Sequence, residues 1–216
     1  MSVDLSQVVY AIGRFENGSI TLLGTAFGVS EAKVATAFHV VGQDDRQLVL
    51  IHPRISSLMD YQDTSDASVN TIKLKMTAAD PVRDLCILEL EDAKISLGYS
   101  LGSTDSVPTG APIVTLGFPH ANFGRMVLTQ QQANVGARVL IENAGQKSKH
   151  IVLNTQAREG QSGGPVLDGA MRTVVAIVIG SYAPGGGGGI SLGGIDPATL
   201  HQTTHAISAE YLGAMI

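Results

Sequence analysis

Short apolar segments separated by turn-forming residues make up most of the chain, and they have the length of β-strands. In the first half, the pattern predicts strands at residues 7–15, 19–29, 33–37, 47–52, 71–76 and 84–90. In the second half, it predicts strands at residues 113–116, 125–130, 138–142, 150–154, 165–167, 174–179 and 206–207. Asn17-Gly18 lies between the first two and is typical of a hairpin turn, because both residues tolerate positive φ. Many short strands joined by such turns predict an all-β protein.

Two polar stretches interrupt this strand pattern. Residues 56–70 are predicted to form an exposed loop. Its three aspartates lack the fixed glycine and final glutamate of a calcium-binding loop, so a calcium site is not expected there. Residues 95–108 are rich in Gly, Ser, Thr and Pro and are predicted to connect two units. We therefore expect one barrel in residues 1–100 and a second in residues 101–216.

Length, charge and cysteine content limit which class of protein and which kinds of partner are expected. The chain has 216 residues, enough for two small β domains, and a net charge of −5. A negative chain without a basic region does not favour nucleic acid as a partner. Cys86 is the only cysteine, so no internal disulfide can form and a reducing, cytoplasmic location is expected.

The two ends of the chain carry further information. Residues 1–4 lack the basic and apolar regions of a signal peptide, and no apolar run reaches the roughly 18 residues of a membrane span. Residues 209–216 have the spacing of a short helix, with Ser208 as its N-cap. The chain stops at this helix, so we expect a domain of a longer protein that carries additional domains.

Gly160-Gln161-Ser162-Gly163-Gly164-Pro165 is the most informative segment. Glycines around a serine allow a tight backbone and the close approach of a substrate carbonyl. In such a turn, the N–H groups of Gly160 and Ser162 can converge on one point and stabilise an oxyanion, with a further contact from Gly163. The segment therefore indicates a nucleophilic serine, provided that a base and an orienting carboxylate are present.

Candidates for both groups occur earlier in the chain. His39 follows the strand predicted at 33–37, and Asp84 stands at the head of another strand. Asp80 is a rival for the carboxylate role, but it precedes Pro81 and is more typical of a turn. Each residue alone is more often structural, whereas the occurrence of all three motifs favours a His39, Asp84, Ser162 triad. The pattern predicts no zinc site, since no Cys/His cluster has the required spacing.

These motifs resemble those of the chymotrypsin-like (trypsin-like) serine peptidases, and most closely the bacterial HtrA/DegP-type branch, here without its PDZ module. The matching segments are Thr36-Ala37-Phe38-His39-Val40-Val41, Asp84-Leu85-Cys86-Ile87-Leu88, the Ser162 segment, Leu116-Gly117-Phe118-Pro119, Gly24-Thr25-Ala26-Phe27 and His205-Ala206-Ile207-Ser208. The resemblance implies two six-stranded antiparallel β-barrels with the active site in the cleft between them. It implies a serine endopeptidase that cuts polypeptides through an acyl-enzyme and needs no cofactor.

The resemblance also suggests which residues line the pocket for the substrate residue before the cut bond, P1. Gln156 and Ala157 precede the nucleophile, and Ser181 ends the facing strand. No aspartate lies where it would bind a basic P1, so a small or medium apolar P1 is expected. His205 leaves open an acidic P1 if its side chain faces the pocket.

Control of the site is the last expectation. Gln161 replaces the aspartate that pairs with a new N-terminus in zymogen-activated relatives, so we expect no activation by N-terminal insertion. The glycine-rich segment 182–203 could gate the site, as could the loop 119–124. A latent protease-like binding or signalling module that needs loop ordering by a partner is therefore the alternative function. Esterase activity of the same site on small acyl substrates is a third.

Overall fold

The first half of the chain closes into a six-stranded antiparallel barrel, in the order β1-β2-β3-β6-β5-β4. A computed structural model describes residues 4–182 and 203–216. The strands of this barrel are β1 (Val9–Glu16), β2 (Ser19–Gly28), β3 (Lys33–Ala37), β4 (Leu48–Ile51), β5 (Thr71–Asp80) and β6 (Leu85–Leu90). Asn17 and Gly18 both have positive φ in the β1–β2 turn, as this pair predicts.

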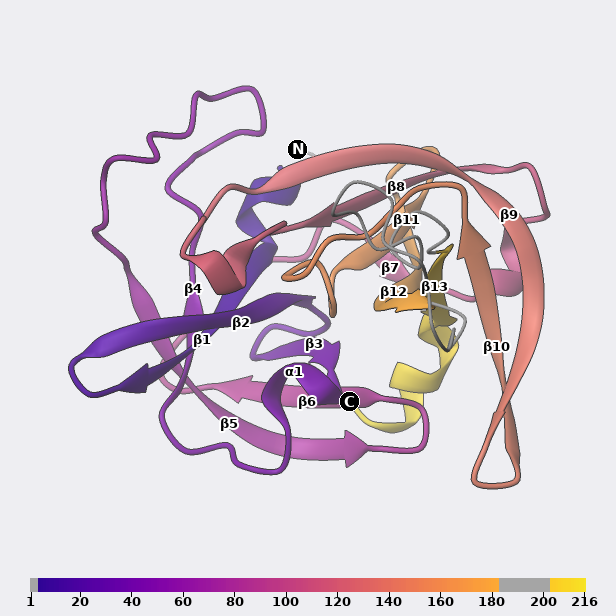
Figure 1. Ribbon diagram of the computed structural model, residues 1–216, viewed down its shortest axis with the longest axis horizontal. Coiled ribbons are helices and arrows are strands. Elements are labelled where there is room, and N and C mark those ends of the chain that lie inside the picture. Colours follow the sequence, from indigo (N-terminus) through magenta and orange to yellow (C-terminus); the bar gives the residue numbers. More distant parts are fainter. Residues whose placement is uncertain (1–3, 183–202) are drawn as a thin grey trace, which may run out of the picture.

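The second half forms another barrel, in the order β11-β8-β9-β10-β13-β12, which a β11–β12 pairing closes. Its strands are β8 (Pro112–Gly117), β9 (Thr129–Asn143), β10 (Gln146–Leu153), β11 (Pro165–Asp168), β12 (Thr173–Tyr182) and β13 (Thr203–Ser208). The short β7 (Ser100–Leu101) adds to β12 in parallel. The predicted all-β fold with two six-stranded antiparallel barrels is confirmed, and the barrels pack against each other (Figure 1).

Strand β9 differs most from the prediction. It runs without a break over 15 residues, whereas strands were predicted at 125–130 and 138–142. Its first part pairs with β8, and from Val135 onward it pairs with β10. Gly136 allows close packing at this crossing, because a Cβ there would lie 2.2 Å from Asn154 Oδ1.

A shared apolar core joins the two barrels. Phe27 from the first barrel and Leu116, Phe118 and Ile207 from the second belong to one buried cluster. Each fully buried side chain of this size contributes about 1.5–3 kcal/mol to folding. The core that the two barrels share therefore holds them against each other.

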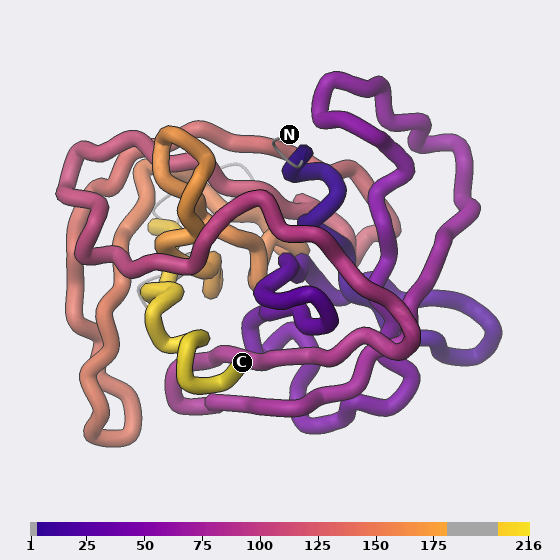
Figure 2. Tube along the Cα trace, turned by 180° about the vertical axis from the view of Figure 1, so that it is seen from behind, coloured from indigo at the N-terminus to yellow at the C-terminus, as the bar shows by residue number. Residues whose placement is uncertain are grey.

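The connection between the barrels lies beside the C-terminal segment (Figure 2). Residues Ala209–Ala214 form the 3₁₀ helix η4 where a short helix was predicted. Ser208 does not cap it with its side chain; its hydroxyl accepts a hydrogen bond from Thr104 N at 3.1 Å. No helix in the described ranges is long and apolar enough to cross a membrane.

Candidate active site

His39 lies on α1 (Phe38–Val41), a single helical turn directly after β3. Val40 and Val41 are buried and fix this turn on the barrel, while the His39 side chain is half exposed. Gly24 makes room for the turn, since a Cβ there would lie 2.9 Å from Val40 and 3.1 Å from Ser162 O. The base candidate and the nucleophile candidate therefore approach the same point of β2.

Asp84 holds His39 through both of its carboxylate oxygens. The last pair of the β3–β6 ladder, Ala37 with Leu85, brings the two segments together. Asp84 Oδ2 lies 2.6 Å from His39 Nδ1, and Oδ1 accepts a hydrogen bond from His39 N at 2.8 Å. Phe38 N also donates to Asp84 O at 3.0 Å. The ring of His39 is thus oriented by a carboxylate that is itself fixed on the backbone.

Asp80, the rival carboxylate, has a different role. Its oxygens accept hydrogen bonds from Arg83 N at 3.1 Å and from Arg83 Nη1 at 2.8 Å. Asp80 therefore braces the turn between β5 and β6, which in turn presents Asp84 to His39.

Ser162 is fixed between the two barrels. Its carbonyl accepts a hydrogen bond from Thr25 N at 3.0 Å, and the next residue, Gly163, donates from its N to Val178 O at 2.7 Å. Gly163 has φ of 83°, and a Cβ there would lie 2.2 Å from Thr25 O, so no larger residue fits. The Ser162 hydroxyl donates to Ile179 O at 3.1 Å and makes no hydrogen bond with His39.

The backbone before Ser162 forms the turn expected of an oxyanion hole. Gln161 N donates to Arg158 O at 3.0 Å, and Gly160 has φ of 92° while Glu159 does not have positive φ. These values define a type II turn, which requires a residue such as glycine at its third position. Within the described residues, the N–H groups of Gly160 and Ser162 donate to no acceptor. Both donors are therefore available to a ligand.

Contacts outside the motif fix the orientation of this turn. Glu159 O accepts a hydrogen bond from His120 N at 2.6 Å. Because C=O and N–H point in opposite directions across a trans peptide, Gly160 N–H points away from His120. Asn122 Nδ2 adds a hydrogen bond to Glu159 Oε2 at 2.6 Å, and Thr25 Oγ1 donates to Gly160 O at 2.7 Å.

Gln161 replaces an ion pair with amide hydrogen bonds. Its side chain is only 3% exposed. Oε1 accepts from Arg158 N at 2.7 Å, and Nε2 donates to Gln131 Oε1 at 3.0 Å. The turn is thus braced from within the folded domain, without a charged chain terminus.

A cavity of about 320 Å³ lies beside Ile179, whose carbonyl accepts the hydrogen bond of the Ser162 hydroxyl. Its lining includes Asp84, Ile179, Gly180, His150 and His205, so the His205 side chain faces this cavity. Burial lowers the pKa of both His150 and His205. Both imidazoles are therefore neutral near pH 7 when the cavity is empty.

The other predicted pocket residues lie in neighbouring positions. Gln156 and Ala157 are partly buried but do not line this cavity. Ala157 N donates to Thr204 Oγ1 at 2.7 Å, which ties the segment before the nucleophile to β13. Ser181 belongs to β12 through its backbone pairing with Thr204. Most of the predicted gate at 182–203 lies outside the described residues.

Several contributors to the site carry no motif of their own. The contacts of Thr25, His120, Asn122, Glu159 and Gln131 are made across long sequence separations. Thr25 was noted only as part of a strand segment that resembles the family, and the loop 119–124 only as a possible gate of the site. The residues next to them in the sequence do not predict that they contact the turn before Ser162. Of the described residues, no group of His, Cys, Asp or Glu could hold a metal ion.

One family of known proteins matches most of the chain. Residues 24–177, more than half of the chain, match the family model described as "Trypsin-like peptidase domain". No curated protein sequence matches the chain.

Solved structures of proteases share the fold. The MamO protease domain from Magnetospirillum magneticum has a TM-score of 0.69 and 13% identity, over 100% of this chain and 99% of that one. The active form of the Rv3671c protease from M. tuberculosis has a TM-score of 0.67 and 19% identity, over 97% and 79%. The HtrA-type protease AlgW, solved with a decapeptide, has a TM-score of 0.69 and 16% identity, over 97% and 63%.

Proposed function

Since the chain belongs to the trypsin-like peptidases, we propose that it is a serine endopeptidase that cuts polypeptides through an acyl-enzyme. Ser162 is the proposed nucleophile, His39 the base and Asp84 the orienting carboxylate. The observation that carries this proposal is the pair of hydrogen bonds that Asp84 accepts from His39, from Nδ1 at 2.6 Å and from the backbone N at 2.8 Å. These bonds support the proposal that His39 is held in an orientation suited to proton transfer.

His39 moves the proton in both halves of the reaction. With Nδ1–H donating to Asp84, Nε2 carries the lone pair that accepts the Ser162 proton. The resulting imidazolium is stabilised by the carboxylate and then protonates the leaving amine. Water repeats the sequence on the acyl-enzyme and releases the second product.

Ser162 must turn before it can react. Its hydroxyl donates to the Ile179 carbonyl in the resting state, and attack requires rotation of the side chain toward His39. One neutral hydrogen bond contributes about 1 kcal/mol net, so its loss is easily offset when the new bond to His39 forms. We propose that substrate binding accompanies this rotation.

The oxyanion of the tetrahedral intermediate is bound by the free N–H groups of Gly160 and Ser162. Each donor of this kind contributes about 2.7–4 kcal/mol to transition-state stabilisation. The substrate residue before the cut bond is proposed to be small or medium and apolar, because Gln156, and not an aspartate, lies in the segment before the nucleophile. Since His205 faces the cavity beside Ile179, an acidic residue is the alternative.

Labelling with a fluorophosphonate probe tests the proposal. The intact protein should be labelled, whereas Ser162→Ala and His39→Ala should not. Each substitution should lower kcat on a peptide substrate by about 10⁴-fold or more. Labelling that persists in Ser162→Ala would contradict the assignment of the nucleophile.

The Ser162 hydroxyl bond to Ile179 also favours a second candidate, a latent protease-like module that needs a partner to become active. A latent site would leave the folded protein unlabelled by the probe. Labelling would then appear only after a partner is added. An active resting enzyme should react with the probe alone.

A further inference from the structure

Asp84 has an unusual backbone conformation. Its φ is 58°, in the left-handed region that glycine and, less often, asparagine and aspartate adopt. Residues 81–84 form the turn between β5 and β6, and Asp84 is the last residue of this turn. A strained conformation of this kind persists only where the surrounding contacts hold it in place. The contacts of the turn therefore help to decide where the Asp84 carboxylate lies.

Two contacts from the second barrel reach this turn. Asn143, the last residue of β9, donates from Nδ2 to Val82 O at 2.8 Å. Tyr211, on η4, places its ring against the guanidinium of Arg83, whose Cζ lies 4.5 Å from the ring centroid. The two contacts are made at the two residues before Asp84. The second barrel thus holds the turn of the first barrel that carries the proposed orienting carboxylate.

The Tyr211 ring provides an interaction that hydrogen bonds do not supply to Arg83. The Arg83 side chain is 21% exposed, and its Nε is buried without a hydrogen-bond partner in residues 4–182 and 203–216. An arginine guanidinium is weakly hydrated and is attracted to the face of an aromatic ring. The ion pair of Arg83 with Asp80 lies within the first barrel, so the ring contact is the one that crosses to the second. Asp80→Asn keeps an acceptor for Arg83 and leaves the ring contact in place.

Tyr211 is itself held by the second barrel. Its hydroxyl accepts a hydrogen bond from Lys149 N on β10 at 2.9 Å, and its side chain packs against the core cluster that the two barrels share. Arg83 and Asn143 line the cavity beside Ile179, whereas Tyr211 does not. A change at Tyr211 therefore acts on the site through Arg83 and not through a contact within that cavity.

We propose that Tyr211 is a positioning residue for the reaction. Its ring holds Arg83, Asp84 follows Arg83 directly in the chain, and Asp84 orients His39. This inference rests on the proposed peptidase function, in which Asp84 has that role. The second barrel, which carries Ser162, then also fixes the carboxylate of the first barrel.

The kinetics of two variants at position 211 test the proposal. Tyr211→Leu removes the ring and should lower kcat on a peptide substrate by about 10–100-fold with little change in KM, because a displacement of about 1 Å at the site can cost that much. Tyr211→Phe keeps the ring and loses only the hydroxyl, so its kcat should stay within about twofold of that of the intact protein. In an Asp84→Asn background, Tyr211→Leu should have almost no further effect, since residues that act through one another are not additive.

The tautomer of His39 gives a readout that does not require activity. His39 donates to Asp84 in its Nδ1–H form. Long-range ¹H–¹⁵N correlation spectra at about pH 9, well above the range in which histidines ordinarily titrate, identify this form, and His39→Ala assigns its signals. Tyr211→Leu should increase the share of the Nε2–H tautomer, whereas Tyr211→Phe should not.

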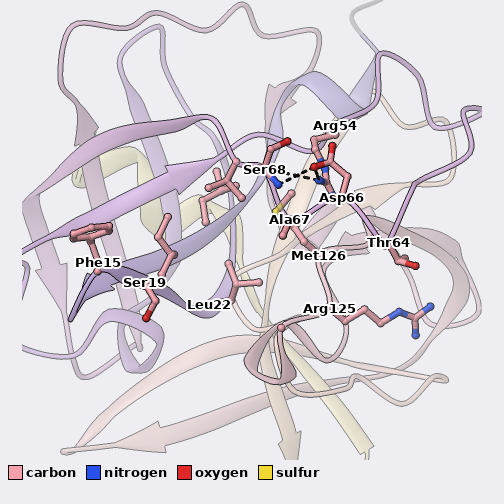
Figure 3. A pocket seen from close by; sticks show the side chains of 15 residues that line it. Phe15, Ser19, Leu22, Arg54, Thr64, Asp66, Ala67, Ser68, Arg125 and Met126 are labelled. Atoms are coloured by element: carbon pink, nitrogen blue, oxygen red, sulfur yellow. Dashed lines mark hydrogen bonds and ion pairs between the residues drawn. The ribbon is translucent and has the colours of Figure 1, made fainter.

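A substitution of Arg83 tests the same contact from its other partner. Arg83→Gln leaves the Tyr211 ring in place and removes the cation, so it should reproduce both effects, and it replaces Tyr211→Leu if that variant does not fold. Arg54→Gln is the matched control, because the Arg54 side chain is 25% exposed and forms an ion pair with Asp66 at 3.0 Å (Figure 3). Arg54 lines a pocket that shares no lining residue with the cavity that contains Asp84. The control should change neither kcat nor the tautomer.

The outcomes separate the positioning role from the peptidase function. If the intact protein hydrolyses peptides, and Tyr211→Leu and Arg83→Gln keep both kcat and the tautomer, the positioning role is overturned while the peptidase function stands. A fall in kcat without a change of tautomer also overturns it, because the effect would not pass through His39. If the intact protein shows neither hydrolysis nor probe labelling, the tautomer alone decides. A shift in Tyr211→Leu that Tyr211→Phe lacks then supports the role, and an unchanged tautomer overturns it.

Discussion

Asp84 makes two hydrogen bonds to His39 as an acceptor, one at the ring and one at the backbone. An amide in its place has one oxygen and one N–H₂ group, so it cannot accept at both positions. The two contacts with His39 therefore require a carboxylate at position 84, and a polar side chain of the same size cannot make both.

We expect Asp84→Asn to lower kcat by about 10⁴-fold, since the amide favours the wrong tautomer of His39. The free energy of unfolding should change much less, because the side chain is partly exposed. Steady-state kinetics and urea denaturation of the same preparation measure the two effects.

Asp80→Asn is the matched control for this experiment. Asp80 bonds to Arg83 and braces the turn, so its substitution should lower the free energy of unfolding by about 1 kcal/mol and change kcat little. An Asp80 variant that loses activity as severely as the Asp84 variant would contradict the roles given to these two residues.

Gln161 provides a prediction for the turn at residues 158–161, which is proposed to present the oxyanion donors. Gln161→Leu keeps the volume but removes the acceptor of Arg158 N and the donor to Gln131. If the turn loses its orientation, kcat should fall by about 10²–10³-fold, the effect of losing one oxyanion donor. Probe labelling should slow in parallel while KM changes little.

Gln131→Leu separates this effect from a general loss of stability. It removes the bond to Gln161 Nε2 but leaves the bond between Gln161 Oε1 and Arg158 N. Its kcat should therefore exceed that of Gln161→Leu clearly. Equal activity of the two variants would show that the Arg158 contact is unimportant.

At the level of elements, Thr25 on β2 of the first barrel contacts the turn before Ser162 and a second segment of the second barrel. Thr25 Oγ1 donates to Gly160 O and accepts from Phe118 N at 3.1 Å, and Thr25 O accepts from Thr36 Oγ1 at 2.7 Å. The side chain is fully buried. One hydroxyl thus joins a strand of the first barrel to two segments of the second.

Thr25→Val should destabilise the protein, because it leaves the buried Gly160 O and Phe118 N without this partner. Each unpaired group costs about 1–3 kcal/mol. Thr21→Val, at an exposed position of the same strand, is the control and should be close to neutral. Thermal unfolding of both variants measures the difference, and similar melting temperatures would contradict the linking role of Thr25.

The elements that the sequence predicts well are those whose pattern is local. The strand at 33–37 and the turn at Asn17-Gly18 depend on neighbouring residues and match the structure. Strand β9 was divided in the prediction because its polar residues obscure the alternation. Its continuity comes from pairing with β8 and β10, which is a tertiary effect. The same reason hid the contacts of His120 and Thr25 to the oxyanion turn, whereas the motifs around Ser162, His39 and Asp84 are short and local.

At the level of the whole molecule, partly buried histidines in both barrels make the stability depend on pH. Burial lowers the pKa of His52, His150 and His205 below the ordinary value of 6.5. His52 belongs to the first barrel, where it packs edge-on against Tyr10 at 4.8 Å. The unfolded chain therefore takes up protons near pH 6.5 that the folded chain does not take up.

The free energy of unfolding should be highest above pH 6.5. It should decrease as the pH falls from 6.5 through the lowered pKa values of these histidines. The carboxylates with lowered pKa values, such as Asp105, lose their contribution only at a more acidic pH. Urea denaturation at pH 7.5 and pH 5.5 measures the change. A variant with glutamine at positions 52, 150 and 205 should show a smaller decrease, and an undiminished decrease would assign it to other groups.

Because Ser162 comes from one barrel and His39 with Asp84 from the other, no single barrel contains the proposed chemistry. The connection between Leu90 and Ser100 is the only covalent link in the sequence from the first barrel to the second. A chain cut within that connection would yield two fragments, each lacking part of the site. Hydrolysis would return only where the fragments meet and their shared core re-forms, so the molecule could serve as a split reporter that converts proximity of two fused proteins into enzymatic turnover.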